Sequence, residues 1–116
     1  YIILNSILKL KKGNAIDIWE KMETNRIKRW QKQPRDYPNA GSVFKRPKGY
    51  YVGQLIEELG LKGYKYGGAM ISDKHAGFIV NYDHAKGQDV LQLINIIKKK
   101  VFEKYKIHLE VEQRII

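Results

Sequence analysis

Residues 88–105 carry the pattern that most narrows the fold. Five apolar residues share the three- and four-residue spacing of one helix face: Val90, Ile94, Ile97, Val101 and Tyr105. Asp89 lies near the positive end of this predicted helix, and three consecutive lysines at 98–100 lie nearer its negative end, as the helix dipole favours. The pattern predicts a long amphipathic helix, and its apolar face needs a partner layer.

Shorter segments show complementary patterns. Residues 15–31 and 51–59 also have helical spacing, and the first is followed by prolines 34 and 38 while Gly60 suits the end of the second. Short strands are predicted at 2–10, 64–66, 69–71, 77–81 and 109–116, and residues 43–44 are predicted to form a short strand or a turn. About three helices among strands with hairpin-like spacing predict an α+β domain, with the helices on one side of a small antiparallel or mixed sheet.

The size and composition exclude several classes of protein. A chain of 116 residues has room for one compact domain. It contains no cysteine, which excludes a disulfide scaffold, a thiolate zinc site and a cysteine nucleophile. Its three histidines, at 75, 84 and 108, share no ligand spacing, so we expect no metal. No apolar run approaches the roughly 20 residues of a membrane span, and we expect no membrane partner.

The positive charge is concentrated in the first half of the chain. The chain has 22 Lys and Arg against 12 Asp and Glu, a net charge of +10. Residues 1–49 hold 12 against 4, or +8, whereas residues 50–116 hold 10 against 8, or +2. This asymmetry indicates an anionic partner for the first half, such as nucleic acid, a phosphorylated ligand or an acidic surface. A well-solvated basic face explains the charge equally well.

Tyrosines among the lysines keep nucleic acid in consideration. Tyr50, Tyr51, Tyr64 and Tyr66 could stack on bases while neighbouring lysines bind phosphates. No recognised nucleic-acid-binding motif is present, however, and half-buried core tyrosines would give the same pattern. A basic nucleic-acid-binding module is therefore the alternative interpretation of this chain.

The stretch AGSVFKRP, residues 40–47, is the most informative candidate site. Ser42 follows a glycine in a predicted loop, with Lys45 and Arg46 close behind. Two cations within a few residues could hold a diphosphate, and the G-x-S-x-G elbow of a serine nucleophile is absent. Taken alone, the stretch favours an anion-binding loop over a nucleophile, and an ordinary polar loop remains open. The glycine-rich run 63–68 lacks phosphate-loop spacing and is predicted to serve turns.

Three blocks in order extend this interpretation. AGSVFKRP (40–47), QLIEELGLKGYKYGGAMISDKHAGFIVN (54–81) and LEVEQRII (109–116) together closely resemble the C-terminal part of the UDP-N-acetylenolpyruvoylglucosamine reductase (MurB) family. The resemblance implies that residues 1–12 are the last strand of an FAD-binding region and that residues 13–116 are the substrate-binding domain. The connection from Lys11 to Ala15 is short, so the chain looks like the shorter class of the family, which lacks a tyrosine-bearing loop insertion.

The resemblance implies a cytoplasmic flavoprotein of peptidoglycan synthesis. In this family FAD accepts a hydride from NADPH and passes it to UDP-GlcNAc-enolpyruvate, which gives UDP-N-acetylmuramate. FAD would be bound mainly by an N-terminal region that this sequence does not contain. We therefore expect a fragment that is inactive alone, whose macromolecular partner is the remainder of its own chain rather than nucleic acid.

Two catalytic roles follow from the resemblance. Ser42 matches the serine that protonates the substrate carbon opposite the incoming hydride, and Glu112 matches the glutamate that helps to stabilise the enolic intermediate. Without the resemblance, Glu112 would be interpreted as a solvent-facing strand residue paired with Arg114. A further arginine of the family's catalytic set belongs to the N-terminal part.

Four substrate-binding residues are expected as well. Lys32 matches a lysine that contacts the UDP diphosphate, and Arg46 stands where other members carry an asparagine that binds the same ligand. Lys45 follows the serine motif, and His75 lies in the KHA block near the expected substrate. For His75, a role in holding the fold together is equally compatible with the sequence.

Overall fold

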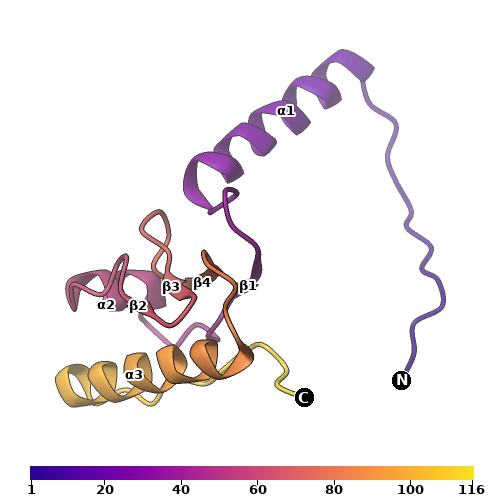
Figure 1. Ribbon diagram of the computed structural model, residues 1–116. Coiled ribbons are helices and arrows are strands. Elements are labelled where there is room, and N and C mark those ends of the chain that lie inside the picture. The colour runs from indigo at the N-terminus through magenta and orange to yellow at the C-terminus, as the bar shows by residue number, and fades with distance from the viewer. The chain divides into compact units, whose positions relative to one another are not determined.

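A computed structural model describes all 116 residues, which divide between Gln31 and Lys32 into two units (Figure 1). In the first unit, residues 1–14 form no helix or strand and are exposed. The strand predicted for residues 2–10 is therefore not formed here, because a strand is stable only when neighbours pair its backbone groups, and this segment has none. The assignment of residues 1–12 to an FAD-binding region stays a prediction.

Helix α1 (Ala15–Lys32) forms as predicted, but it buries none of its residues. Asn14 precedes the helix, and its side-chain Oδ1 accepts the backbone N–H groups of Ile16 at 3.0 Å and Asp17 at 3.2 Å. This side-chain cap satisfies donors that would otherwise lack partners at the helix start. Further along the helix, Glu23 and Arg26 form an ion pair at 2.7 Å. Local contacts thus support α1.

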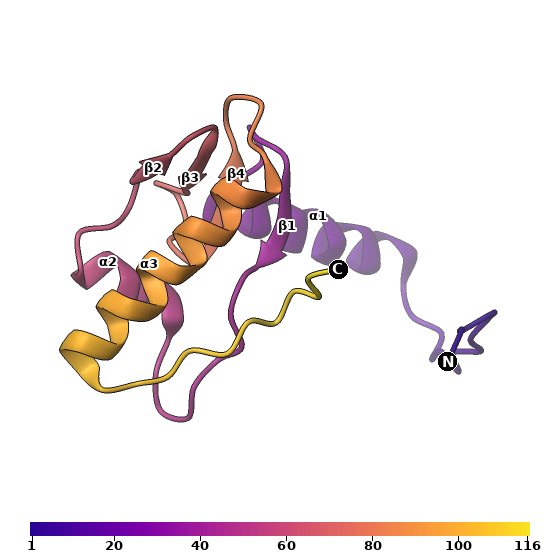
Figure 2. The ribbon, with the colours of Figure 1, turned by 60° about the horizontal axis from the view of Figure 1, so that its bottom comes forward.

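The second unit, residues 32–116, contains a four-stranded antiparallel sheet in the order β1-β4-β3-β2. Its strands are β1 (Asn39–Ser42), β2 (Lys65–Tyr66), β3 (Ala69–Ile71) and β4 (Phe78–Asn81). Helix α3 (Gly87–Tyr105) lies across the sheet, and α2 (Val52–Glu58) packs beside α3 (Figure 2). The predicted α+β architecture is confirmed.

The core of this unit lies between α3 and the sheet. Helix α3 contributes Leu93, Ile94, Ile97 and Val101, each at most 4% exposed. They pack with buried residues of α2 and the strands, among them Ile56 and Ile71. The predicted stripe therefore forms the buried face, although Val90 and Tyr105 at its two ends are only half-buried.

Two glycines form the tight turn between β2 and β3, as predicted. Tyr66 pairs with Ala69, so only Gly67 and Gly68 connect the strands, and Gly67 has a φ of +53°. A Cβ at Gly68 would lie 1.9 Å from the backbone oxygen of Asp83. The turn can pack this closely against the segment after β4 only because Gly68 has no side chain.

Two segments differ from the predictions. Ser42 ends strand β1 instead of lying in a loop, and the register of β1 with β4 is irregular where Gly41 adopts a φ of +82°. The strand predicted for 109–116 is reduced to one bridge, between Val111 and Phe44. The ladder stops there because the side chain of Gln113, rather than the backbone, donates hydrogen bonds to the carbonyl oxygens of Ala40 and Gly41.

None of the helices is long and apolar enough to cross a membrane.

Candidate functional site

A shallow hollow brings Ser42 and Glu112 together, and it is lined by Ala40 and Gln113 as well. The bridge between Phe44 and Val111 sets the C-terminal segment beside β1, and the Glu112 N–H donates to the Val43 oxygen at 2.9 Å. The side chains of Ser42 and Glu112 are both exposed. Neither the Ser42 hydroxyl nor the Glu112 carboxylate has a hydrogen-bond or ion-pair partner in the chain, so both are available to a ligand.

A second hollow, with a volume of about 340 Å³, is the larger of the two in the number of residues that line it. Ser42 lines both hollows, so this residue belongs to each of them. The walls of the larger one come from the segment after β1, from α2 and from the turn before β4. Its polar side chains are Ser42, Arg46, Tyr51, Gln54, Glu57, Lys62, Lys74 and His75.

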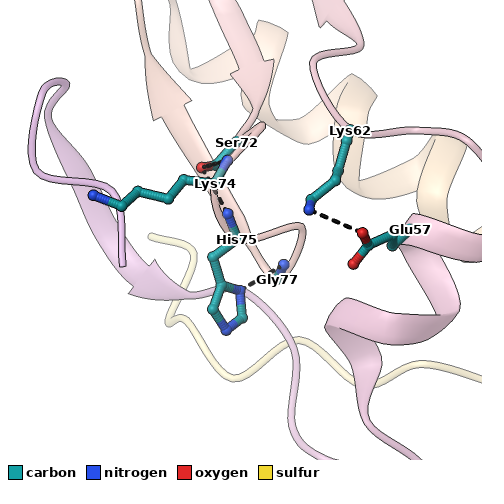
Figure 3. A network of polar contacts seen from close by, with 6 residues as sticks. All are labelled: Glu57, Lys62, Ser72, Lys74, His75 and Gly77. Atoms are coloured by element: carbon teal, nitrogen blue, oxygen red, sulfur yellow. Dashed lines mark hydrogen bonds and ion pairs between the residues drawn. The ribbon is translucent and has the colours of Figure 1, made fainter. Parts of the chain in front are cut away.

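The charged residues of the larger hollow favour an anion. Three cations, Arg46, Lys62 and Lys74, outnumber the one carboxylate, Glu57, by two. Lys62 is held at 3.0 Å from that carboxylate, whereas Lys74 forms no ion pair (Figure 3). Arginine and lysine side chains with this surplus suit phosphate groups.

A buried serine organises the turn that carries His75. The Ser72 hydroxyl oxygen, in a residue only 1% exposed, accepts the backbone N–H groups of Lys74 at 3.2 Å and His75 at 3.1 Å. The Gly77 N–H in turn donates to His75 Nδ1 at 3.0 Å (Figure 3). Because Nδ1 accepts, the neutral ring carries its proton on Nε2, which is left as a donor.

Two glycines leave room for this imidazole ring. A Cβ at Gly77 would lie 2.9 Å from the His75 Cε1, and one at Gly53 would lie 3.3 Å from the same atom. Phe78 packs its edge against the ring, with the two centroids 4.8 Å apart. The ring is therefore held in place from several sides.

A family profile described as "UDP-N-acetylenolpyruvoylglucosamine reductase, C-terminal domain" matches residues 33–116, which is most of the chain. The chain belongs to this reductase family. Its matched residues include the whole of both hollows.

Individual relatives agree with this assignment. The chain is 56% identical over 115 residues to UDP-N-acetylenolpyruvoylglucosamine reductase of Fervidobacterium nodosum, covering 98% of the chain and 37% of that protein. It is 51% identical to the reductase of the same name from Caldanaerobacter subterraneus, covering 100% of the chain and 38% of that protein. The chain thus spans less than two-fifths of the length of these relatives.

A solved structure supports the fold. The reductase (MurB) of Thermus caldophilus matches with a TM-score of 0.75 and 40% sequence identity, covering 91% of this chain and 37% of that one.

The structure brings four of the six predicted reductase site residues to one region. Ser42 and Glu112 share the shallow hollow, while Arg46 and His75 line the larger hollow that Ser42 also reaches. The alternative pairing of Glu112 with Arg114 is not formed.

The other two predicted residues line neither hollow. The Lys45 ammonium forms an ion pair with the carboxylate of Glu110, and its backbone N–H donates to the Glu110 oxygen at 2.8 Å. Lys32 is the last residue of α1, at the boundary between the two units. Their roles at the substrate stay predictions.

Sequence reasoning missed several residues of the larger hollow. Tyr51, Glu57, Lys62 and Lys74 line it, and Ser72 holds the turn beneath it. Lys62 and Lys74 were open to prediction, because they are the cations of the GLKGY and SDKHAGF stretches that carry the family resemblance. The sequence indicated Tyr51 only as a possible base-stacking residue, because its position in this hollow depends on how the chain folds back after Arg46.

Proposed function

We propose that this chain is the substrate-binding part of a cytoplasmic enzyme of peptidoglycan synthesis that reduces UDP-GlcNAc-enolpyruvate to UDP-N-acetylmuramate. In this proposal residues 1–12 complete an FAD-binding region and residues 13–116 bind the substrate. The observation that carries it is the position of Ser42, which lines both the shallow hollow with Glu112 and the larger hollow with its three cations. This substrate has a diphosphate for one hollow and an enolpyruvyl group for the other.

The larger hollow would bind the diphosphate. The Arg46 guanidinium and the Lys74 ammonium supply positive charge, and the Nε2–H of His75 supplies a neutral donor. Charge-assisted hydrogen bonds of this kind are among the strongest available to a phosphate. Lys32 and Lys45 would add further positive charge around the ligand.

The shallow hollow would hold the enolpyruvyl end. When bound, FAD would take a hydride from NADPH and supply it to the terminal carbon of the enolpyruvyl group. Negative charge then develops on the substrate as an enolate, and the Ser42 hydroxyl gives its proton to the neighbouring carbon. A hydroxyl is a weak acid, so it depends on the charges around it, and the Glu112 carboxyl group would help to polarise the substrate and stabilise the enolic intermediate. Because Ser42 is exposed, water can restore its proton.

Toward FAD, the residues of this chain would only hold the substrate that accepts the hydride. An exposed hydroxyl and an unpaired carboxylate in one hollow suit the acceptor side of a hydride transfer. The cofactor's own binding site would lie in the remainder of the protein. The 116-residue chain is accordingly expected to purify colourless, and a stoichiometric flavin spectrum would contradict this division.

Replacement of Ser42 by Ala in the complete reductase tests the mechanism. Reduction of the flavin by NADPH should be unchanged, because Ser42 acts only on the second substrate. The following reaction with UDP-GlcNAc-enolpyruvate should slow by about 10²–10⁴-fold, the usual loss when a positioned proton donor is removed. Thr24→Ala, which removes an exposed hydroxyl outside both hollows and outside residues 1–12, is the matched control. Unchanged rates in both half-reactions would remove Ser42 from the mechanism.

A basic nucleic-acid-binding module is the second candidate function. Tyr50, Tyr51, Tyr64 and Tyr66 are all between 42% and 61% exposed, and lysines lie beside them. Titration of the chain with UDP-GlcNAc and with a short oligonucleotide separates the two functions. Saturable binding of the oligonucleotide alone would reverse the order of the two proposals.

A further inference from the structure

The structure assigns Tyr51 the role of a positioning residue for Arg46. We infer that its ring holds the Arg46 guanidinium in the orientation that binds the diphosphate of a nucleoside-diphosphate sugar. This inference rests on the proposed function, because the larger hollow must bind that ligand.

Two contacts fix the Arg46 side chain. Its guanidinium carbon lies 3.8 Å from the centroid of the Tyr51 ring, which is a cation–π contact. Its Nε–H donates to the backbone oxygen of Tyr50 at 3.3 Å. An exposed arginine otherwise loses much rotational freedom when it binds a ligand, and side-chain ordering of this kind weakens binding. A guanidinium already held in place avoids part of that loss.

These contacts also decide which donors remain. The Tyr50 oxygen occupies Nε–H and the Tyr51 ring covers one face of the guanidinium. The two terminal NH₂ groups are left, and they present parallel donors to two oxygens of a phosphate. No carboxylate forms an ion pair with Arg46. The fork is therefore free for an anionic ligand.

A tight turn returns the chain over Arg46. The Tyr50 N–H donates to the Pro47 oxygen at 3.2 Å, and Gly49, the third residue of that turn, has a φ of +80°. A type II turn needs positive φ at its third residue, and Gly49 occupies that position, while Pro47 is the first residue of the turn. The turn brings Tyr51 back to stack on a residue five positions earlier.

The cation–π contact with Arg46 is the one polar or ring contact of the Tyr51 side chain. It is 61% exposed, and it makes no side-chain hydrogen bond at the start of α2, where only its backbone oxygen accepts the Leu55 N–H at 3.1 Å. Substitution of this side chain should therefore leave the fold intact. A loss of ligand affinity would then come from the hollow and not from unfolding.

A double-mutant cycle tests the inference. The dissociation constant for UDP-GlcNAc is measured by calorimetry on the 116-residue chain and on Tyr51→Leu, Arg46→Gln and the double variant. Tyr51→Leu should weaken binding about two- to fivefold, the value of an exposed cation–π contact. Arg46→Gln should weaken it about tenfold or more, as loss of a charged hydrogen-bond donor predicts. The double variant should bind no more weakly than Arg46→Gln alone, because Tyr51 acts through Arg46.

Two conservative variants complete the design. Tyr51→Phe keeps the ring and should restore the wild-type affinity. Tyr50→Leu removes a neighbouring exposed tyrosine but keeps the backbone oxygen that Arg46 contacts, so it should also match the wild type.

The outcomes separate the two proposals. If the wild type binds UDP-GlcNAc and Tyr51→Leu binds equally well, the positioning role is overturned while the proposed function stands. Additive losses in the double variant would overturn it too, because Tyr51 would then contact the ligand directly. If the wild type does not bind UDP-GlcNAc, the proposed function is overturned and this inference with it.

Discussion

Helices α1 and α3 have nearly the same length, 18 and 19 residues, yet they end in opposite environments. Helix α3 buries four apolar residues against the sheet and α2, whereas α1 buries none. Five apolar residues of α1 are between 46% and 68% exposed, and Trp30 is half-buried: the five are Ile16, Ile18, Trp19, Met22 and Ile27. An apolar stripe in a sequence thus predicts a helix, but it does not say where the partner of that stripe lies.

The two helices are consequently stabilised in different ways. Contacts within a few residues support α1, such as the Asn14 cap and the Glu23–Arg26 ion pair. Helix α3 gains most from packing, which is the usual source of helix stability in proteins. Truncation of an apolar side chain should therefore lower the free energy of unfolding more in α3 than in α1.

The largest difference is expected between Leu93→Ala and Ile27→Ala. Leu93 is fully buried in α3, so its truncation should lower the free energy of unfolding of the second unit by about 2–5 kcal/mol. Ile27 is 50% exposed in α1, and its truncation should change stability by no more than about 0.5 kcal/mol. Urea unfolding followed by circular dichroism measures both.

Fluorescence sharpens this comparison, because both tryptophans, Trp19 and Trp30, lie in the first unit. Tryptophan emission should follow α1 and be unaffected by Leu93→Ala. A similar loss for Ile27→Ala and Leu93→Ala would contradict the comparison, since it would mean that the α1 stripe is buried in solution.

The next largest effect is expected at the turn between β2 and β3. Gly68→Ala would place a Cβ 1.9 Å from the Asp83 backbone oxygen, so the turn and the segment after β4 must separate. A loss of about 1–3 kcal/mol is expected, as for other overpacking substitutions. Gly87→Ala is the matched control, because a Cβ at Gly87 would meet no atom within 4 Å and the substitution should not destabilise. Equal stabilities of the two variants would show that the turn is loosely packed.

These positions also show what the sequence could and could not predict. Helix α3, helix α2 and the glycine turn followed from local patterns, because spacing and backbone freedom are local properties. The meeting of Ser42 with Glu112 depends on one bridge between Phe44 and Val111, which lie far apart in the chain. Only the family resemblance indicated that pair.

The differences from prediction have a common origin as well. The strand expected at 2–10 has no neighbour to pair with, and the strand expected at 109–116 is limited because the side chain of Gln113, rather than its backbone, bonds to Ala40 and Gly41. Alternation in a sequence predicts that a segment can pair, whereas the length of the ladder depends on the partner's shape. The same holds for Tyr51, whose contact with Arg46 requires the turn at Gly49.

A smaller effect is expected from Gln113→Ala at the shallow hollow. The Gln113 Nε2 donates to the oxygens of Ala40 at 3.2 Å and Gly41 at 3.3 Å, and so ties the C-terminal segment to β1. Its loss should cost about 0.5–1.5 kcal/mol and speed hydrogen exchange at the Glu112 amide, which bonds to Val43. Gln88→Ala, in the exposed first turn of α3, should change neither quantity. Unchanged exchange at Glu112 would show that the bridge alone holds the segment.

The smallest effect is expected in the pH dependence of stability, to which two carboxylates, Asp89 and Glu23, contribute in different units. Hydrogen bonds from the backbone N–H groups of Lys86 and Gly68 lower the pKa of Asp89 below its ordinary value of 3.8. The side-chain hydrogen bond from Arg26 lowers the pKa of Glu23 below 4.5. The contacts of Asp89 join α3 to the β2–β3 turn, whereas those of Glu23 remain within α1.

A lowered pKa in the folded state stabilises the fold above the ordinary pKa, and that contribution is lost as the pH falls through the folded value. The stability difference between wild type and Asp89→Asn should therefore be constant near neutral pH and shrink below about pH 3.8. Glu23→Gln should leave unfolding of the second unit unchanged at every pH and alter only the helix content of α1. Urea titrations at several pH values give both curves. The opposite result would be a loss of stability of the second unit in acid that changes with Glu23→Gln and not with Asp89→Asn. It would contradict the contrast between α1, which local contacts stabilise, and α3, which tertiary contacts stabilise.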